Sequence, residues 1–279
     1  MKNDLIDDKK QNSDETAALN VLDFITPTEI VDLPSKGLGY PKDHALCGKD
    51  SIEIKFMTAK EEDILSSASL LKKGIALERF LKAIVKDQSI NTETMLSGDR
   101  NAVIIAARRS GYGADYETKV NCPACGEVNK MTFDLSQPKI KEPSSEVEID
   151  EQGIMTVMTP MTKIEIKMKL MDGKDETYLA KQAKMKKDKN LPDSQITDQF
   201  KRMIVSVAGH TDRSVINMYV EKMPTRDSRY LRKIFKEASP NVEIKEMFTC
   251  RSCNFTQELE VPFGADFFWP DTLIYGNCL

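Results

Sequence analysis

The sequence has no apolar run of the roughly 18 residues that a membrane-spanning helix needs, so we expect no membrane span. Residues 1–16 are polar and carry charges of both signs, unlike the apolar centre of a secretory signal peptide. Without an export signal, the expected compartment is the reducing cytosol, where disulfide bonds are rare. Cysteines in such a protein are expected to stay free or to bind metal.

Histidine is also scarce, and the two in the chain, His44 and His210, lie in unrelated contexts. The sequence contains no His-Glu-x-x-His metal motif, no Gly-x-Ser-x-Gly nucleophile motif and no glycine-rich phosphate loop. These absences exclude the sequence signatures of the common hydrolases and nucleotide-binding enzymes. We therefore predict a protein that is not an enzyme.

An excess of positive charge is missing as well. The chain has 40 Lys and Arg against 44 Asp and Glu, which gives a net charge of −4. Domains that bind nucleic acid usually carry a basic surface, so the net charge argues against nucleic acid as a partner. The arginines at positions 100, 108 and 109 are expected on a salt-bridged helix surface.

Cysteine, by contrast, is arranged in an informative way. The six cysteines include two Cys-x-x-Cys pairs, Cys122 with Cys125 and Cys250 with Cys253. Each such turn brings two thiolates toward one ion at about 2.3 Å, and two turns complete a closed tetrahedral zinc site. Strand-like segments flank both pairs, at 117–121, 128–134, 243–249 and 255–261. The pattern predicts one structural Zn²⁺ per chain, with no open position for a substrate.

The separation of the two pairs is unusual. Residues 126–249 lie between them, whereas a compact zinc ribbon separates its pairs by roughly 15–20 residues. The chain must therefore leave the ribbon and return to it. The alternatives are two independent turns or a redox dithiol, although no thioredoxin-like βαβ pattern surrounds either pair. Cys47 and Cys278 are expected to be free thiols.

The hydrophobic patterning predicts how the rest of the chain is organised. Residues 51–56 alternate as a strand, Thr58 and Glu61 form a capping box for a helix that Gly74 would end, and residues 173–239 have a helical pattern throughout. The predicted class is α+β, a discontinuous four-cysteine zinc ribbon of two knuckle hairpins with short helices and a mainly helical insertion. The expected segments are a disordered or extended arm (1–27), a strand and helical region with the first knuckle (28–136), a hairpin plus helical insertion (137–240), and the second knuckle with an aromatic C-terminal segment (241–279).

Two stretches are candidates for binding a partner protein. One is a Pro/Gly turn and the other is crowded with aromatic side chains, which often anchor interfaces. The candidate residues are Pro34, Ser35, Lys36 and Gly37 in the turn, and Phe267, Phe268 and Trp269 in the aromatic stretch. The alternative for the aromatic stretch is that it packs back over the ribbon and stabilises it.

Several of these segments, taken in this order, resemble one family, the baseplate hub subunits and hub assembly proteins of T-even-type contractile-tailed bacteriophages. The resemblance covers residues 28–136 well and the last 40 loosely. It is carried by VDLPSKGLGY at 31–40, MTAKEEDIL at 57–65, NAVIIAAR at 101–108 with GYG at 111–113, CPACG at 122–126 with FDL at 133–135, and FFWP at 267–270.

The resemblance implies a non-enzymatic phage protein that takes part in the assembly or structure of the baseplate central hub. Its partners would be other hub or tail-tube proteins, with a homo-oligomer as a further option. It would act in the host cytoplasm during assembly, and it would either stay in the virion or leave as an assembly chaperone. The alternative from the residues alone is a zinc-ribbon nucleic-acid-binding regulatory protein, which the net charge disfavours.

Overall fold

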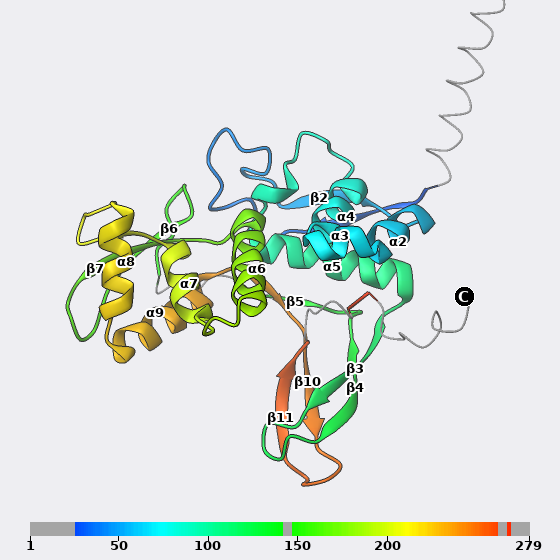
Figure 1. Cartoon of the computed structure of the whole chain (residues 1–279). Coiled ribbons are helices and arrows are strands. Elements are labelled where there is room, and N and C mark those ends of the chain that lie inside the picture. Colours follow the sequence, from blue (N-terminus) through cyan, green and yellow to red (C-terminus); the bar gives the residue numbers. More distant parts are fainter. Residues whose placement is uncertain (1–25, 142–146, 262–266, 269–279) are drawn as a thin grey trace, which may run out of the picture.

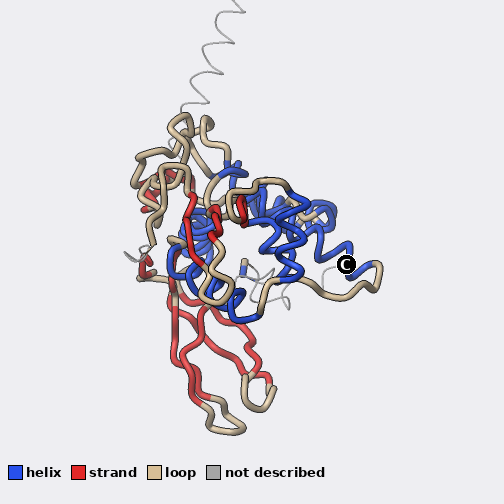
Figure 2. The backbone as a smooth tube through the Cα atoms, turned by 90° about the vertical axis from the view of Figure 1, so that its left-hand side faces the viewer, coloured by secondary structure: helices blue, strands red, loops and turns tan. Residues whose placement is uncertain are grey.

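The structure is a computed structural model that describes residues 26–141, 147–261 and 267–268. Helices and short sheets form the upper body of the molecule, and two hairpins project from it side by side, one of strands β3 and β4 and one of β10 and β11 (Figure 1; Figure 2). This mixture of helices and small antiparallel sheets confirms the predicted combination of α and β structure.

All the pairings between strands in the described residues are antiparallel. They join β1 (Thr28–Asp32) to β2 (Ser51–Lys55), β3 (Asp115–Asn121) to β4 (Val128–Asp134), β5 (Lys139–Lys141) to β9 (Asn241–Glu243), β7 (Glu165–Lys169) to both β6 (Ile154–Met158) and β8 (Ile204–Val207), and β10 (Lys245–Thr249) to β11 (Thr256–Glu260). The helices are α2 (Ala59–Ser66), α3 (Ala68–Lys73), α4 (Ala76–Ile84), α5 (Ser97–Tyr112), α6 (Gly173–Asp188), α7 (Gln195–Met203), α8 (Arg213–Lys222) and α9 (Thr225–Ala238), with a 3-10 turn η1 at Thr92–Thr94.

The local signals before α5 act largely as the sequence indicates. The predicted strand at 51–56 is β2, and its apolar residues Ile52 and Ile54 are buried. The capping box of Thr58 and Glu61 is present at the start of α2. The single helix predicted to run to Gly74 is wrong, because Ser67 adopts an extended conformation and separates α2 from α3. Gly74 ends α3 with a left-handed φ of 68°, which glycine adopts without steric cost.

Helix α5 lies at the centre of the main core. Residues 102–108 are all buried, because the β1–β2 sheet, α6 and β9 all contact this helix. The expectation that its arginines lie on the surface is therefore wrong for Arg100 and Arg108, although Arg100 does form salt bridges, to Glu78 and Glu176. Buried Arg100 donates to Glu78 and to the carbonyl of Thr92, and buried Arg108 donates to the carbonyl of Phe267. These partners compensate the two buried charges, although Arg100 Nε has no hydrogen-bond partner among the described residues and lies 3.3 Å from Glu176 Oε2.

The segment between the two cysteine pairs packs directly on this central region. One hydrophobic cluster contains Leu96 and Ile105 of the first part of the chain together with Leu170, Ile204 and Leu231. The predicted helical pattern of residues 173–239 is confirmed for α6–α9 but is wrong at β8. There the segment Ile204–Val207, in which every residue but Ser206 is β-branched, pairs with β7 instead of continuing α7.

Asp227 fixes the β6–β7 hairpin to α9 from a fully buried position. Its carboxylate accepts hydrogen bonds from the Met161 amide at 2.8 Å and from the Thr162 amide and hydroxyl at 3.1 and 2.8 Å. Burial favours the neutral acid, but these hydrogen bonds outweigh it and hold the pKa of Asp227 below its ordinary value. A group with a lowered pKa stabilises the fold above its ordinary pKa, and this contribution is lost as the pH falls through the lowered value.

We therefore expect Asp227→Asn to lower the free energy of unfolding by about 2–3 kcal/mol at neutral pH, because an amide nitrogen cannot replace an accepting oxygen. The difference from wild type should shrink as the pH falls below the ordinary Asp pKa of about 3.9. Urea unfolding of wild type and variant, at neutral pH and again below the ordinary Asp pKa, measures this difference in the free energy of unfolding. Asp188→Asn at the exposed end of α6 serves as the control. A difference that does not change with pH would contradict the role given to the charge.

Candidate metal centre

Two hairpins present the cysteines through matching turns. Cys122 follows the last residue of β3, and Cys250 follows the last residue of β10. In the first turn the Cys122 amide donates to the Glu127 carbonyl at 2.8 Å, and the Gly126 amide donates back to Cys122 at 2.9 Å. The second turn has the same two bonds, from Cys250 to Phe255 at 2.9 Å and from Asn254 to Cys250 at 3.0 Å.

The residue after each second cysteine explains why the turns close in this way. Gly126 has φ of +76° and Asn254 has φ of +57°, so both adopt the left-handed conformation. Glycine adopts it freely, and asparagine is among the few other residues that do so often. The local sequences Cys-x-x-Cys-Gly and Cys-x-x-Cys-Asn therefore give two turns of equivalent shape.

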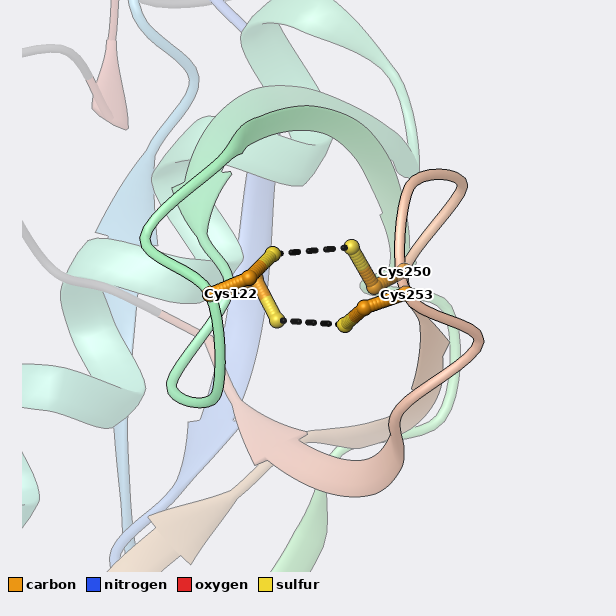
Figure 3. A group of neighbouring side chains, drawn as sticks. Cys122, Cys250 and Cys253 are labelled. Atoms are coloured by element: carbon orange, nitrogen blue, oxygen red, sulfur yellow. Dashed lines mark hydrogen bonds between the residues drawn. The ribbon is translucent and has the colours of Figure 1, made fainter.

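The four sulfurs converge between the hairpins (Figure 3). The Sγ atoms of Cys122 and Cys253 lie 3.7 Å apart, as do those of Cys125 and Cys250, and all four Sγ atoms lie within 4.8 Å of one another. A disulfide needs about 2.05 Å. Four sulfurs at about 2.3 Å from a tetrahedral ion would be roughly 3.8 Å apart. The arrangement thus fits four ligands of one metal ion and confirms that the predicted residues come together.

The surroundings of Cys250 favour the thiolate form. Cys122 and Cys250 are buried, whereas Cys125 and Cys253 are exposed. Burial raises the pKa of the Cys250 thiol, but the backbone amides of Cys253 and Ser252 donate to its sulfur and bring the pKa down to about 6. The thiolate is the form that binds metal, so these amides favour Cys250 as a ligand. In the same turn a backbone hydrogen bond lowers the pKa of the Cys253 thiol, but burial and the neighbouring thiols raise it above its ordinary value.

Asn129 is a residue of this centre that sequence reasoning missed. Buried on β4, it donates from Nδ2 to the Glu127 carbonyl at 3.0 Å and lies 3.6 Å from Cys250 Sγ. Its Oδ1 accepts the Arg251 amide at 3.0 Å, so one side chain joins the first hairpin to the second turn. The available signal was its position, because Asn129 stands where the alternation with Met131 and Phe133 calls for an inward apolar residue.

Replacing Asn129 with alanine is expected to weaken metal retention by roughly tenfold, since partners that orient metal ligands typically contribute 10–100-fold to affinity. Competition with a chromophoric chelator measures the change. Asn121→Ala, at the exposed end of β3, is the matched control and should leave retention unaltered. Equal retention by the two variants would show that Asn129 does not support the centre.

The candidate partner turn is fixed to the start of α5. Ser35 donates from its amide and hydroxyl to Asp99 at 2.9 and 2.7 Å, and the Tyr40 hydroxyl donates to the same carboxylate at 2.7 Å. Pro34, Ser35 and Gly37 are buried, and among the four candidates only Lys36 is exposed. The exposed residues of this turn are thus Lys36 and Leu38, the latter 66% exposed.

The aromatic candidates Phe267 and Phe268 are buried, whereas side chains that anchor a partner protein would be exposed in the isolated chain. Both side chains lie in the main core. Phe267 packs edge-on against Tyr116 with the ring centroids 4.9 Å apart, and Phe268 packs edge-on against Phe80 with the centroids 5.1 Å apart. In this isolated chain the two side chains therefore stabilise the fold, as in the alternative of a segment that packs back. Trp269 lies outside the described residues.

Cys47 is not part of the cluster of four cysteines. Its thiol is free and exposed, and Cys278 lies outside the described residues.

In the described part of the chain, no helix combines the length and apolar character needed to cross a membrane.

A known protein family matches most of the chain. Residues 27–269 match the family model described as T4 bacteriophage base plate protein. Neither curated proteins nor solved structures gave a match. The matched region includes both hairpins and all four clustered cysteines. Membership implies a component of the virion tail that interacts with other baseplate proteins, and it suggests a role other than catalysis. The chain belongs to the T4 bacteriophage base plate protein family.

Proposed function

We propose that the protein acts in the assembly or structure of the baseplate central hub, as a non-enzymatic protein with one structural Zn²⁺ per chain. The observation that carries the proposal is the closed cluster of Cys122, Cys125, Cys250 and Cys253 in a member of the baseplate family. Four thiolates in tetrahedral arrangement suit zinc, which has no redox chemistry of its own. When bound, the ion would hold the two hairpins together.

The small core between the hairpins supports a structural metal. Cys122, Phe248 and Cys250 form a separate buried cluster, with Val120, Met131, Phe255 and Leu259 packed against it. Two short hairpins with so few buried side chains gain little free energy from apolar contacts. Metal binding contributes about 10–16 kcal/mol in small zinc domains, which is the kind of stabilisation that such a pair of hairpins needs.

The turn from Pro34 to Leu38 is our candidate for contact with hub or tail-tube proteins. Asp99 holds it rigidly through Ser35, so little conformational entropy would be lost on binding. Leu38 projects a large apolar side chain into solvent at its tip, and Lys36 adds a charge beside it. A rigid apolar tip with an adjacent charge is suited to a pocket on another protein.

Infection with a phage that lacks this chain tests the proposal. We expect hub-containing baseplate intermediates to be missing and wild-type protein supplied in trans to restore them. Leu38→Glu should restore fewer than about one tenth as many infectious particles, if the tip is an interface anchor of the usual strength. Met247→Glu, equally exposed on β10, is the control.

Two results would contradict the proposal. One is normal baseplate formation without the chain. The other is tight, salt-sensitive binding to DNA, which would favour the nucleic-acid-binding alternative. Mass spectrometry of purified virions then separates a hub component, which remains in the particle, from an assembly chaperone that acts in the host cytoplasm and leaves.

A further inference from the structure

Strand β1 has an open edge. Its other edge pairs with β2, and the amide of Leu33 donates to Asp50 while the amide of Phe56 donates to Pro27. In an antiparallel pair the bonded positions alternate, so residues 27, 29, 31 and 33 face β2. The backbone N–H and C=O groups of Ile30 and Asp32 therefore point away from β2, and no described residue bonds them. The far edge of β2 is covered in part by Val85 and Lys86.

An apolar groove lies next to this edge. It has a volume of about 250 Å³, with α5 along it and β5 and β9 at its far side. Most of the residues that line it are apolar, among them Ile30, Ala102, Ile105, Ala106, Ile140 and Val242, and the charged residues Asp32 and Arg109 line it as well. Ile30 is 72% exposed and Ile140 is 40% exposed. An unpaired strand edge beside exposed apolar side chains is the feature that natural proteins usually cover.

We propose that this edge and groove are a docking site for an extended segment of a partner protein, which adds a strand to β1. The unpaired backbone groups call for an extended chain, because only such a chain can bond Ile30 and Asp32 in register. The groove calls for apolar side chains at alternate positions of that segment. The inference rests on the proposed baseplate role only for the identity of the partner.

Charge next to the edge specifies the partner segment further. Asp32 is exposed and forms no ion pair with a described residue. Glu29 accepts Arg109 at 3.0 Å through Oε2, while its Oε1 is buried and has no hydrogen-bond partner among the described residues. Arg109 also lines the groove and offsets the charge of Glu29, so it is the carboxylate of Asp32 that favours a segment with a Lys or Arg beside its apolar residues.

Hydrogen exchange by NMR on the full chain tests the site with a defined probe, the peptide acetyl-Lys-Val-Thr-Val-Thr-Val-amide. The Ile30 and Asp32 amides should exchange quickly in the free protein and about tenfold more slowly with roughly 1 mM peptide, as expected for weak strand addition. The same peptide N-methylated at every residue should give no protection, because neither of its edges keeps a backbone donor and the methyl groups block close approach of the strand.

Two variants distinguish binding of the peptide in the groove from nonspecific binding elsewhere on the protein. Ile30→Lys should abolish protection of the Asp32 amide, whereas Met247→Lys, on the exposed face of β10, should leave it intact. Because both side chains are exposed, circular dichroism should show that both variants fold. Protection that survives in Ile30→Lys would overturn the proposal.

Other outcomes also overturn it. Amides already protected in the dilute free protein would mean that another part of this chain covers the edge. Protection that grows with protein concentration would mean that a second copy covers it. Failure of the peptide to protect the amides would mean that the edge does not accept a strand. None of these results depends on other baseplate proteins, so each leaves the phage experiment on hub assembly to be judged separately.

Discussion

Replacing Cys250 with serine should release the metal and separate the two hairpins. Its sulfur is buried, lies 3.7 Å from that of Cys125 and is oriented by Asn129, so a serine hydroxyl, which is a poor ligand for zinc, cannot take its place. Structural zinc sites contribute about 10–16 kcal/mol, so losing one ligand should cost several kcal/mol of stability in this region. Amide exchange in β3, β4, β10 and β11 should rise accordingly.

The remainder of the fold should respond less. Helices α7–α9 share the main hydrophobic cluster with α5, α6 contacts both α5 and α7, and this packing does not pass through the cysteines. We therefore expect their amides to keep most of their protection in Cys250→Ser. Cys47→Ser removes an exposed free thiol and should retain both metal and stability. Unaltered metal content in Cys250→Ser would contradict the assignment of this residue as a ligand.

Replacing Phe267 with alanine should lower the free energy of unfolding by about 3–5 kcal/mol, the usual cost of removing a buried aromatic ring. The side chain is 1% exposed and packs edge-on against Tyr116 and Phe268. Urea unfolding measures the loss. Met247→Ala on β10 is the control, because that side chain is 66% exposed. If Phe267 were instead a partner anchor, stability would be unchanged and only hub assembly would fall.

The candidate metal centre could be predicted from the sequence because its signals are local. A Cys-x-x-Cys turn with Gly126 or Asn254 after it sets its own geometry, whatever surrounds it. Alternating apolar and polar residues on either side of each cysteine pair predicted the hairpin strands to within a few residues. Two matching turns in one chain then implied one shared ion, although the distance along the chain gave no measure of their separation in space.

The rest depends on tertiary packing, which periodicity does not encode. Arg108 has the same local pattern as an exposed helix residue, and only the return of the chain at Phe267 supplies its buried partner. Asn129 is polar in an inward position, and its role requires the second turn from far along the chain. The strand β8 continues directly from a helix, so its β-branched residues did not stand out from the helical pattern around them.

Elemental analysis combined with X-ray absorption at the metal edge tests the central claim most directly. We expect one zinc per chain, with four sulfur neighbours at about 2.3 Å and no light-atom ligand. Protein purified without added metal under reducing conditions should show this result. Absence of a stoichiometric metal, or a zinc bound by fewer than four sulfurs, would contradict a closed structural site built from Cys122, Cys125, Cys250 and Cys253.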